Sequence, residues 1–244
     1  MEFTYEAYGQ LLEQIVKCEY QFANYHNWKQ FERCVILRHD IDYDPIKAVK
    51  IAEIEKDKGI SSTYFVLITS DFYNIYSEKN NTYFQTLMSY GHEIGLHFDE
   101  TRYEDLRHNV DMLKSKILYE AKRLEDAIQC PVTTVSMHRP SKLILKENLK
   151  IPGLINSYGK EFLYDFKYLS DSRKIWREPI KDLIESREYD RFHILTHAFW
   201  YSEFREDIRS SVSKFINRAA IDRWNVMQDN ITNLADIVSK AEFG

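Results

Sequence analysis

Cysteine is scarce and unpatterned in this chain. Three cysteines occur in 244 residues, and Cys18, Cys34 and Cys130 share no CxxC or CxxxxC spacing. We therefore expect neither a disulfide framework nor a zinc site built from thiolates. The longest apolar stretches, such as residues 65–68, are only as long as a strand, so no membrane-spanning helix is expected. The opening residues MEFTYEAYGQ do not follow the basic-then-apolar order of a signal peptide, and we expect a cytoplasmic protein.

Basic runs and linkers are also absent from the sequence. The 38 acidic and 33 basic residues give a net charge of −5, and no basic stretch indicates a surface that follows a nucleic-acid backbone. No repeat, low-complexity segment or segment rich in proline and glycine divides the chain. We therefore expect residues 1–244 to form one domain that binds no nucleic acid, with the oligomeric state left open.

Short apolar runs alternate with longer helical patterns along the chain, which is typical of parallel α/β folds. We expect strands at 34–37, 63–67, 93–96, 132–137 and 192–195, and weaker ones at 154–156 and 167–169. Helices are expected at 82–90, 103–128 and 204–242, and one more opens at Asp44–Pro45 and stops at Gly59.

Polar residues follow the carboxyl ends of these predicted strands. Because such ends lie on one face of a parallel α/β fold, the side chains are expected to meet in one cleft. Chance placement explains one or two of them but not the whole set. The residues are His39, Asp40, Asp42, His97, His138, Arg139, Asp171 and His197.

The acids and histidines in this set suit metal and proton chemistry. Asp40 and Asp42 point the same way on a strand, so they can share a cation or a proton, unless they only cap a solvated loop. Imidazole with a carboxylate suits zinc, and His97 is the best partner. His197 suits proton transfer near neutral pH, although a neighbouring carboxylate alone could account for it. The aromatic residues 199–201 are either core or a platform for a sugar ring.

The other histidines are assigned structural or surface roles. His92 and His97 lie at opposite ends of one short strand, about 16 Å apart at roughly 3.3 Å per residue, so they cannot bind one ion. His92 is therefore expected to be structural. His26, His108 and His193 are expected at the surface or in packing.

The order of five motifs resembles the polysaccharide deacetylase superfamily, also called the NodB-homology domain or carbohydrate esterase family 4. The resemblance is to its bacterial branch, which has an HDxD first motif and an SxHRP third motif, and it covers about residues 34–200. The motifs are RHDID at 38–42, GHEIGLH at 91–97, SMHRP at 136–140, SDSR at 170–173 and LTH at 195–197.

This resemblance implies a fold and an activity. The fold is a distorted, incomplete (β/α)7 barrel with extra flanking helices, in which an N-terminal helical segment and the C-terminal helices pack on a barrel of about residues 34–200. The activity is metal-dependent hydrolysis of an acetyl group on a carbohydrate, most simply with Zn²⁺ and a metal-activated water. Carried over by motif, Asp40 is the base, Asp42 and His97 bind the metal, His197 is the acid and Asp171 orients the catalytic groups.

The second motif departs from the family pattern, because Thr101 stands where another metal histidine is usual. His138 is the chosen third ligand, since it occupies the motif-three position. Asp99, Glu100 or water are the alternatives. Arg139, next in the chain, is placed with the catalytic residues.

Two other functions remain open beside a deacetylase that acts on a surface-polysaccharide precursor. One is hydrolysis of a different C–N amide bond on the same barrel. The other, motivated by Thr101, is a non-catalytic carbohydrate-binding protein with an incomplete metal site.

Overall fold

The computed structural model describes residues 1–106, 109–146 and 148–242, and the chain divides into two compact units, Met1–Glu203 and Phe204–Gly244. The first unit contains all the strands and all the predicted site residues. The packing of the terminal helices on the barrel, as parts of a single domain, stays a prediction.

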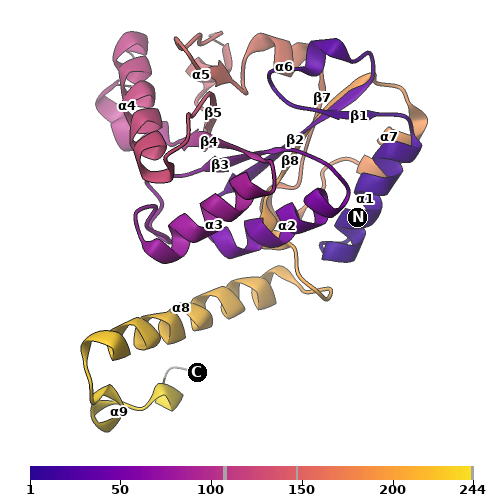
Figure 1. Cartoon of the computed structure of the whole chain (residues 1–244). Helices are drawn as coiled ribbons and strands as arrows, with labels where there is room; N and C mark the ends of the chain where they lie inside the picture. Colours follow the sequence, from indigo (N-terminus) through magenta and orange to yellow (C-terminus); the bar gives the residue numbers. More distant parts are fainter. Residues whose placement is uncertain (107–108, 147, 243–244) are drawn as a thin grey trace. The chain divides into compact units, whose positions relative to one another are not determined.

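One parallel sheet forms the centre of the first unit (Figure 1). The strand order is β6–β5–β4–β3–β2–β8–β7, and the short β1 pairs with β2 beside this path. Among the described residues β6 and β7 end the path without pairing with each other, so the curled sheet stays open. The predicted incomplete (β/α)7 barrel is confirmed, with β1 as an added strand. The strands are β1 (Gln21–Ala23), β2 (Cys34–Ile41), β3 (Thr63–Val66), β4 (Glu93–Phe98), β5 (Thr134–Met137), β6 (Ile155–Asn156), β7 (Lys167–Ser170) and β8 (Arg191–Thr196).

Helices connect most of these strands, and their ends follow from capping residues. Thr4 accepts a hydrogen bond from the backbone of Ala7 and begins the first helix, while Pro45 occupies the first turn of the second. The predicted helix at 103–128 is shorter in the structure, because Asn109 caps a helix that begins at Val110. The helices of this unit are α1 (Tyr5–Lys17), α2 (Pro45–Asp57), α3 (Glu78–Ser89), α4 (Val110–Ile128), α5 (Lys142–Lys146), α6 (Lys160–Tyr164) and α7 (Ile180–Ser186).

The central strand β2 is apolar at its start and charged at its end. Side chains alternate along a strand, so Cys34, Ile36, Arg38 and Asp40 lie on one face. Cys34 and Ile36 belong to a buried cluster that also contains the rings of Tyr25, Trp28, Phe65, Phe162 and Phe166. Arg38 and Asp40 follow them, and both are buried. An apolar floor therefore lies below the polar residues at the carboxyl end of the strand.

The second unit is helical, as the sequence predicts for 204–242. It contains α8 (Ile208–Asn230) and α9 (Leu234–Ile237). Asp207 caps α8 by accepting a hydrogen bond from the backbone of Ser210. No helix in the described part of the chain has the length and apolar character required to cross a membrane.

Candidate metal centre

Three side chains at the carboxyl ends of β2, β4 and β5 meet at one edge of the sheet. Oδ1 of Asp42 lies 3.3 Å from Nε2 of His97 and 3.2 Å from Nδ1 of His138. The two histidine nitrogens are 3.1 Å apart. Asp42 comes directly after β2, His97 lies on β4, and His138 follows β5, which pairs with β4. The structure thus brings the three predicted metal ligands together.

This triangle of atoms fits a divalent metal ion. Ligand atoms about 2.1 Å from a tetrahedral zinc ion are about 3.4 Å from one another, close to the three separations observed. Oδ1 of Asp42 is buried and has no hydrogen-bond partner among the described residues. Burial alone would raise the pKa of Asp42, but the imidazoles of His138 and His97 hold it well below its ordinary value. An ionised oxygen faces two imidazole nitrogens, which is a donor set that zinc favours.

The alternative third ligands contact other groups. Oδ1 of Asp99 accepts hydrogen bonds from the backbone and the hydroxyl of Thr101, the latter at 2.8 Å. Glu100 accepts a hydrogen bond from the backbone nitrogen of Ser141. Neither carboxylate belongs to the group of possible ligand atoms around Asp42, whereas His138 does.

Asp40 lies beside this group and is paired with an arginine that the sequence analysis did not identify. Oδ2 of Asp40 is 3.4 Å from Nε2 of His97. Arg38 donates from Nε to Oδ1 at 2.9 Å and from Nη2 to Oδ2 at 2.8 Å. Burial would raise the pKa of Asp40, but Arg38 and His97 keep it below its ordinary value. Arg139, which was expected in the site, is exposed and makes no described contact with Asp40.

His197 is held by Asp171 on the other side of Asp42. Its Nδ1 is 2.6 Å from Oδ1 of Asp171, and its backbone nitrogen donates to the same carboxylate at 3.0 Å. Its Nε2 lies 3.8 Å from Oδ2 of Asp42. Burial disfavours the imidazolium, but the hydrogen bond and charge of Asp171 outweigh it and raise the pKa of His197 to about 9. The orienting role of Asp171 stays a prediction.

The side chains of the site differ in their exposure. The side chain of His97 is 1% exposed, while those of Asp42, His138 and His197 are 11%, 12% and 12% exposed. A ligand therefore approaches from the side of these last three residues.

The aromatic residues after His197 are part of the core. Phe199, Trp200 and Tyr201 are buried, and Phe199 packs on Tyr43 with ring centres 4.8 Å apart. Phe72, whose ring centre is 5.1 Å from that of Tyr43, is 57% exposed. The proposed platform for a sugar ring thus has no exposed member among residues 199–201.

Behind β2 lies a buried polar cluster that sequence reasoning missed. Glu55 on α2 accepts hydrogen bonds from Tyr8, His39, Ser62 and Tyr64, with His39 at 2.7 Å. Nδ1 of His39 lies 2.5 Å from the hydroxyl of Thr196, the residue before His197. The cluster therefore connects helices α1 and α2 to the strands that carry the site.

The remaining histidines lie away from the metal group. His92 contacts the backbone nitrogen of Ser62 and the carbonyl of Ala52. His26 is exposed, and His193 is buried against the hydroxyl of Tyr25 at 2.8 Å. His108 lies outside the described residues.

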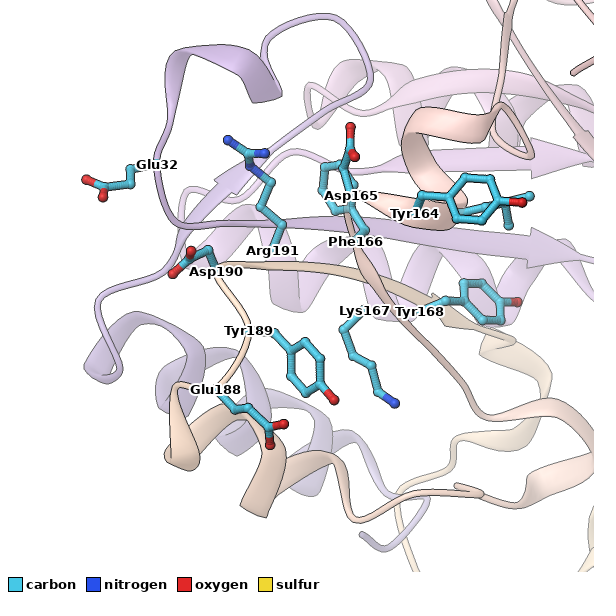
Figure 2. Close-up of a pocket in the computed structure, with 11 residues that line it drawn as sticks. Glu32, Tyr164, Asp165, Phe166, Lys167, Tyr168, Glu188, Tyr189, Asp190 and Arg191 are labelled. Carbon is cyan, nitrogen blue, oxygen red and sulfur yellow. The ribbon is translucent and has the colours of Figure 1, made fainter.

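A separate cavity of about 540 Å³ lies at the opposite ends of two strands (Figure 2). Its lining includes Lys167 and Arg191, the first residues of β7 and β8, together with Tyr164 and Tyr189. None of the predicted site residues lines it. Ligands of parallel α/β folds bind at the carboxyl ends of strands, so the metal group is the better candidate for the functional site.

Comparison with known proteins gives similarities of fold. No family model and no curated protein matches the chain. A family 4 acetyl xylan esterase from Clostridium thermocellum, in complex with a cobalt ion, is 12% identical with a TM-score of 0.43, over 67% of this chain and 73% of that one. A family 4 carbohydrate esterase from Bacillus anthracis is 14% identical with a TM-score of 0.44, over 84% and 83% of the two chains. A CE4 family pseudoenzyme from Bacillus anthracis is 13% identical with a TM-score of 0.43, over 76% and 60%.

The chain is similar to carbohydrate esterase family 4 structures. This is also the family whose motifs the sequence resembles. Because these similarities concern the fold, the function proposed below is derived from the residues of this chain.

Proposed function

We propose that this protein is a metal-dependent hydrolase that removes an acetyl group from an acetylated carbohydrate. One observation carries the proposal: Asp42, His97 and His138 present three ligand atoms to one point. An acidic residue and a basic residue lie next to that point, since Asp40 contacts His97 and His197 contacts Asp42. A metal site flanked by a proton acceptor and a proton donor suits hydrolysis of an amide or ester.

Each residue then has a defined task. A divalent ion held by the three ligands, for which we propose Zn²⁺, would polarise the acyl carbonyl. It would also lower the pKa of the attacking water to near neutral. Asp40 accepts the proton of the attacking water, because it is ionised and lies beside the metal group. His197 carries a proton near neutral pH and gives it from Nε2 to the leaving nitrogen or oxygen. The C–N or C–O bond breaks, and acetate and the deacetylated sugar are released.

The surroundings of the two proton-transfer residues support these tasks. Arg38 stabilises the ionised form of Asp40, and Asp171 stabilises the protonated form of His197. Two titratable groups whose surroundings favour opposite charge states are suited to act as base and acid. We further propose a precursor of a surface polysaccharide as the substrate and the cytoplasm as the location.

Acetate release tests this function. The chelated protein is supplied with Zn²⁺ or Co²⁺ and assayed on N-acetylated and O-acetylated sugars, both free and nucleotide-linked. We expect release that depends on the metal and falls at least about 100-fold, to a residual rate, in Asp40→Asn. The matched control is Asp71→Asn, because that carboxylate is 89% exposed and pairs with Arg102 at the surface.

The outcome also separates the two other functions. Release of an amine without acetate from other amides would indicate a different C–N hydrolase. If the loaded protein binds sugars but releases nothing from the whole panel, the proposal is wrong and a non-catalytic binding protein is favoured.

A further inference from the structure

Arg38 is a fully buried arginine that reaches Asp40 from the same strand. Residues two apart on a strand point to the same side, so Arg38 and Asp40 lie on one face of β2, and Asp42 follows directly after the strand. The guanidinium donates to both oxygens of Asp40. We propose that Arg38 is the positioning residue of the base, holding Asp40 beside the metal group without letting it become a ligand. This inference rests on the proposed function.

The guanidinium itself is held on several sides. Nη1 donates to the hydroxyl of Ser157 at 3.2 Å, and Nη2 approaches the hydroxyl of Tyr158 at 3.5 Å. Its central carbon lies 5.3 Å from the ring centre of Phe65 and 4.9 Å from that of Tyr158. A planar fork enclosed in this way can turn little, so it fixes the plane and the position of the carboxylate that it binds.

Without the guanidinium of Arg38, the divalent ion is a strong alternative partner for Asp40. Its Oδ2 is already 3.4 Å from Nε2 of His97, the nitrogen that faces Asp42 and His138. A carboxylate this near to a divalent ion is attracted to it, and a carboxylate bound to the ion is a poorer proton acceptor. Arg38 binds both oxygens of Asp40 from the side of the apolar cluster at the start of β2, and this opposes movement of the carboxylate toward the ion.

Arg139, which the sequence places with the catalytic residues, makes no described contact with Asp40. Arg139 is exposed, whereas His138 before it points to the metal group. The positive partner of Asp40 therefore comes from β2 itself.

Two substitutions separate positioning from folding. Arg38→Lys keeps the charge but loses the two-pronged geometry, and Arg38→Met removes both. Because Arg38→Met leaves a buried charge unpaired, Arg38→Met/Asp40→Asn is made as well to remove both charges together. Arg33→Met, which breaks the surface pair of Arg33 with Asp190, is the control.

Kinetics give the first result. We expect kcat to fall at least about 10-fold in Arg38→Lys and roughly 100-fold in Arg38→Met, with KM within about threefold, as for a misplaced catalytic group. The loss should be shared with Asp40: the double variant should be no slower than Asp40→Asn alone. If the falls in kcat of the two single variants multiply in the double variant, the proposal is wrong. An unchanged kcat in Arg38→Lys would also overturn it.

The visible spectrum of bound Co²⁺ gives a second result that needs no turnover. We expect the spectrum to change in Arg38→Met, as Asp40 joins the ion, and to return to the wild-type form in the double variant. If the wild-type protein releases acetate but the Co²⁺ spectrum of Arg38→Met is the same as that of the wild type, the positioning role is wrong and the proposed function stands. If the wild-type protein binds Co²⁺ but releases no acetate, the proposed function fails first, and the positioning role with it.

Discussion

Replacing Glu55 by glutamine is expected to destabilise the protein strongly at neutral pH. Glu55 is fully buried and accepts four hydrogen bonds, from Tyr8, His39, Ser62 and Tyr64. Burial alone would raise the pKa of Glu55, but chiefly the charge and hydrogen bond of His39 bring it from 4.5 down to about 2. Glutamine keeps the shape of the side chain, loses the charge and turns a donating NH₂ group toward groups that also donate.

The pKa of Glu55 sets both the size and the pH range of the effect. The difference between 4.5 and about 2 corresponds to about 3 kcal/mol of folding free energy. Because the pKa is lower in the folded state, this stability is fully present above pH 4.5. It is lost as the pH falls from 4.5 toward 2, where the carboxylate takes up a proton even in the folded protein.

Urea unfolding of the wild-type protein and Glu55→Gln, at pH 7 and again at pH 3.5, measures the effect. We expect a difference of about 3 kcal/mol at pH 7 that becomes smaller at pH 3.5. Glu53→Gln is the control, because Glu53 lies on the same helix with its side chain 48% exposed, and it should change stability by less than about 0.5 kcal/mol. A difference for Glu55→Gln below about 1 kcal/mol at pH 7, or one that does not change with pH, would refute this reasoning.

Two further substitutions test the site and its support. Asp171→Asn removes the charge that orients His197, so the initial rate of acetate release should fall at least about 100-fold while Co²⁺ binding is kept. A rate within about threefold of that of the wild type contradicts the role proposed for Asp171. Gly95→Ala should lower the unfolding free energy by about 1–3 kcal/mol in urea titrations, because its methyl group would lie 2.5 Å from both Phe65 and Thr134. An unchanged urea midpoint would contradict this prediction, because Phe65 and Thr134 would then have moved aside without cost.

The barrel could be predicted from the sequence because its strands are apolar runs separated by helical patterns. Local signals place their centres well and their ends less well. The strand β1 is missed, since three residues with one buried side chain show no periodicity, and the strand exists only through its pairing with β2. The start of α4 is misplaced because charged residues before Asn109 continue the helical pattern, whereas the cap begins the helix later.

The site is partly readable for a similar reason. Carboxyl ends of parallel strands gather at one face, so the meeting of Asp42, His97 and His138 follows from their places in the sequence. Strand alternation would also have pointed to Arg38, two residues before Asp40 on the same face.

The cluster around Glu55 could not be predicted in this way. Its donors come from three separate segments of the chain, and their approach depends on how α1 and α2 pack on the sheet. A glutamate on a helix has the same local pattern whether it faces solvent, as Glu53 does, or the core, as Glu55 does.

Metal binding by wild-type and variant proteins tests the proposed centre most directly. The chelated protein is titrated with Co²⁺ and followed by its visible absorption, alongside His138→Ala and the control Thr101→Ala, whose hydroxyl hydrogen-bonds Asp99 outside the metal group. We predict about one ion per chain for the wild-type protein and Thr101→Ala, and an affinity at least about 10-fold lower for His138→Ala. A wild-type protein that binds no Co²⁺, or a His138→Ala variant that binds it as tightly as the wild type, would contradict the metal centre.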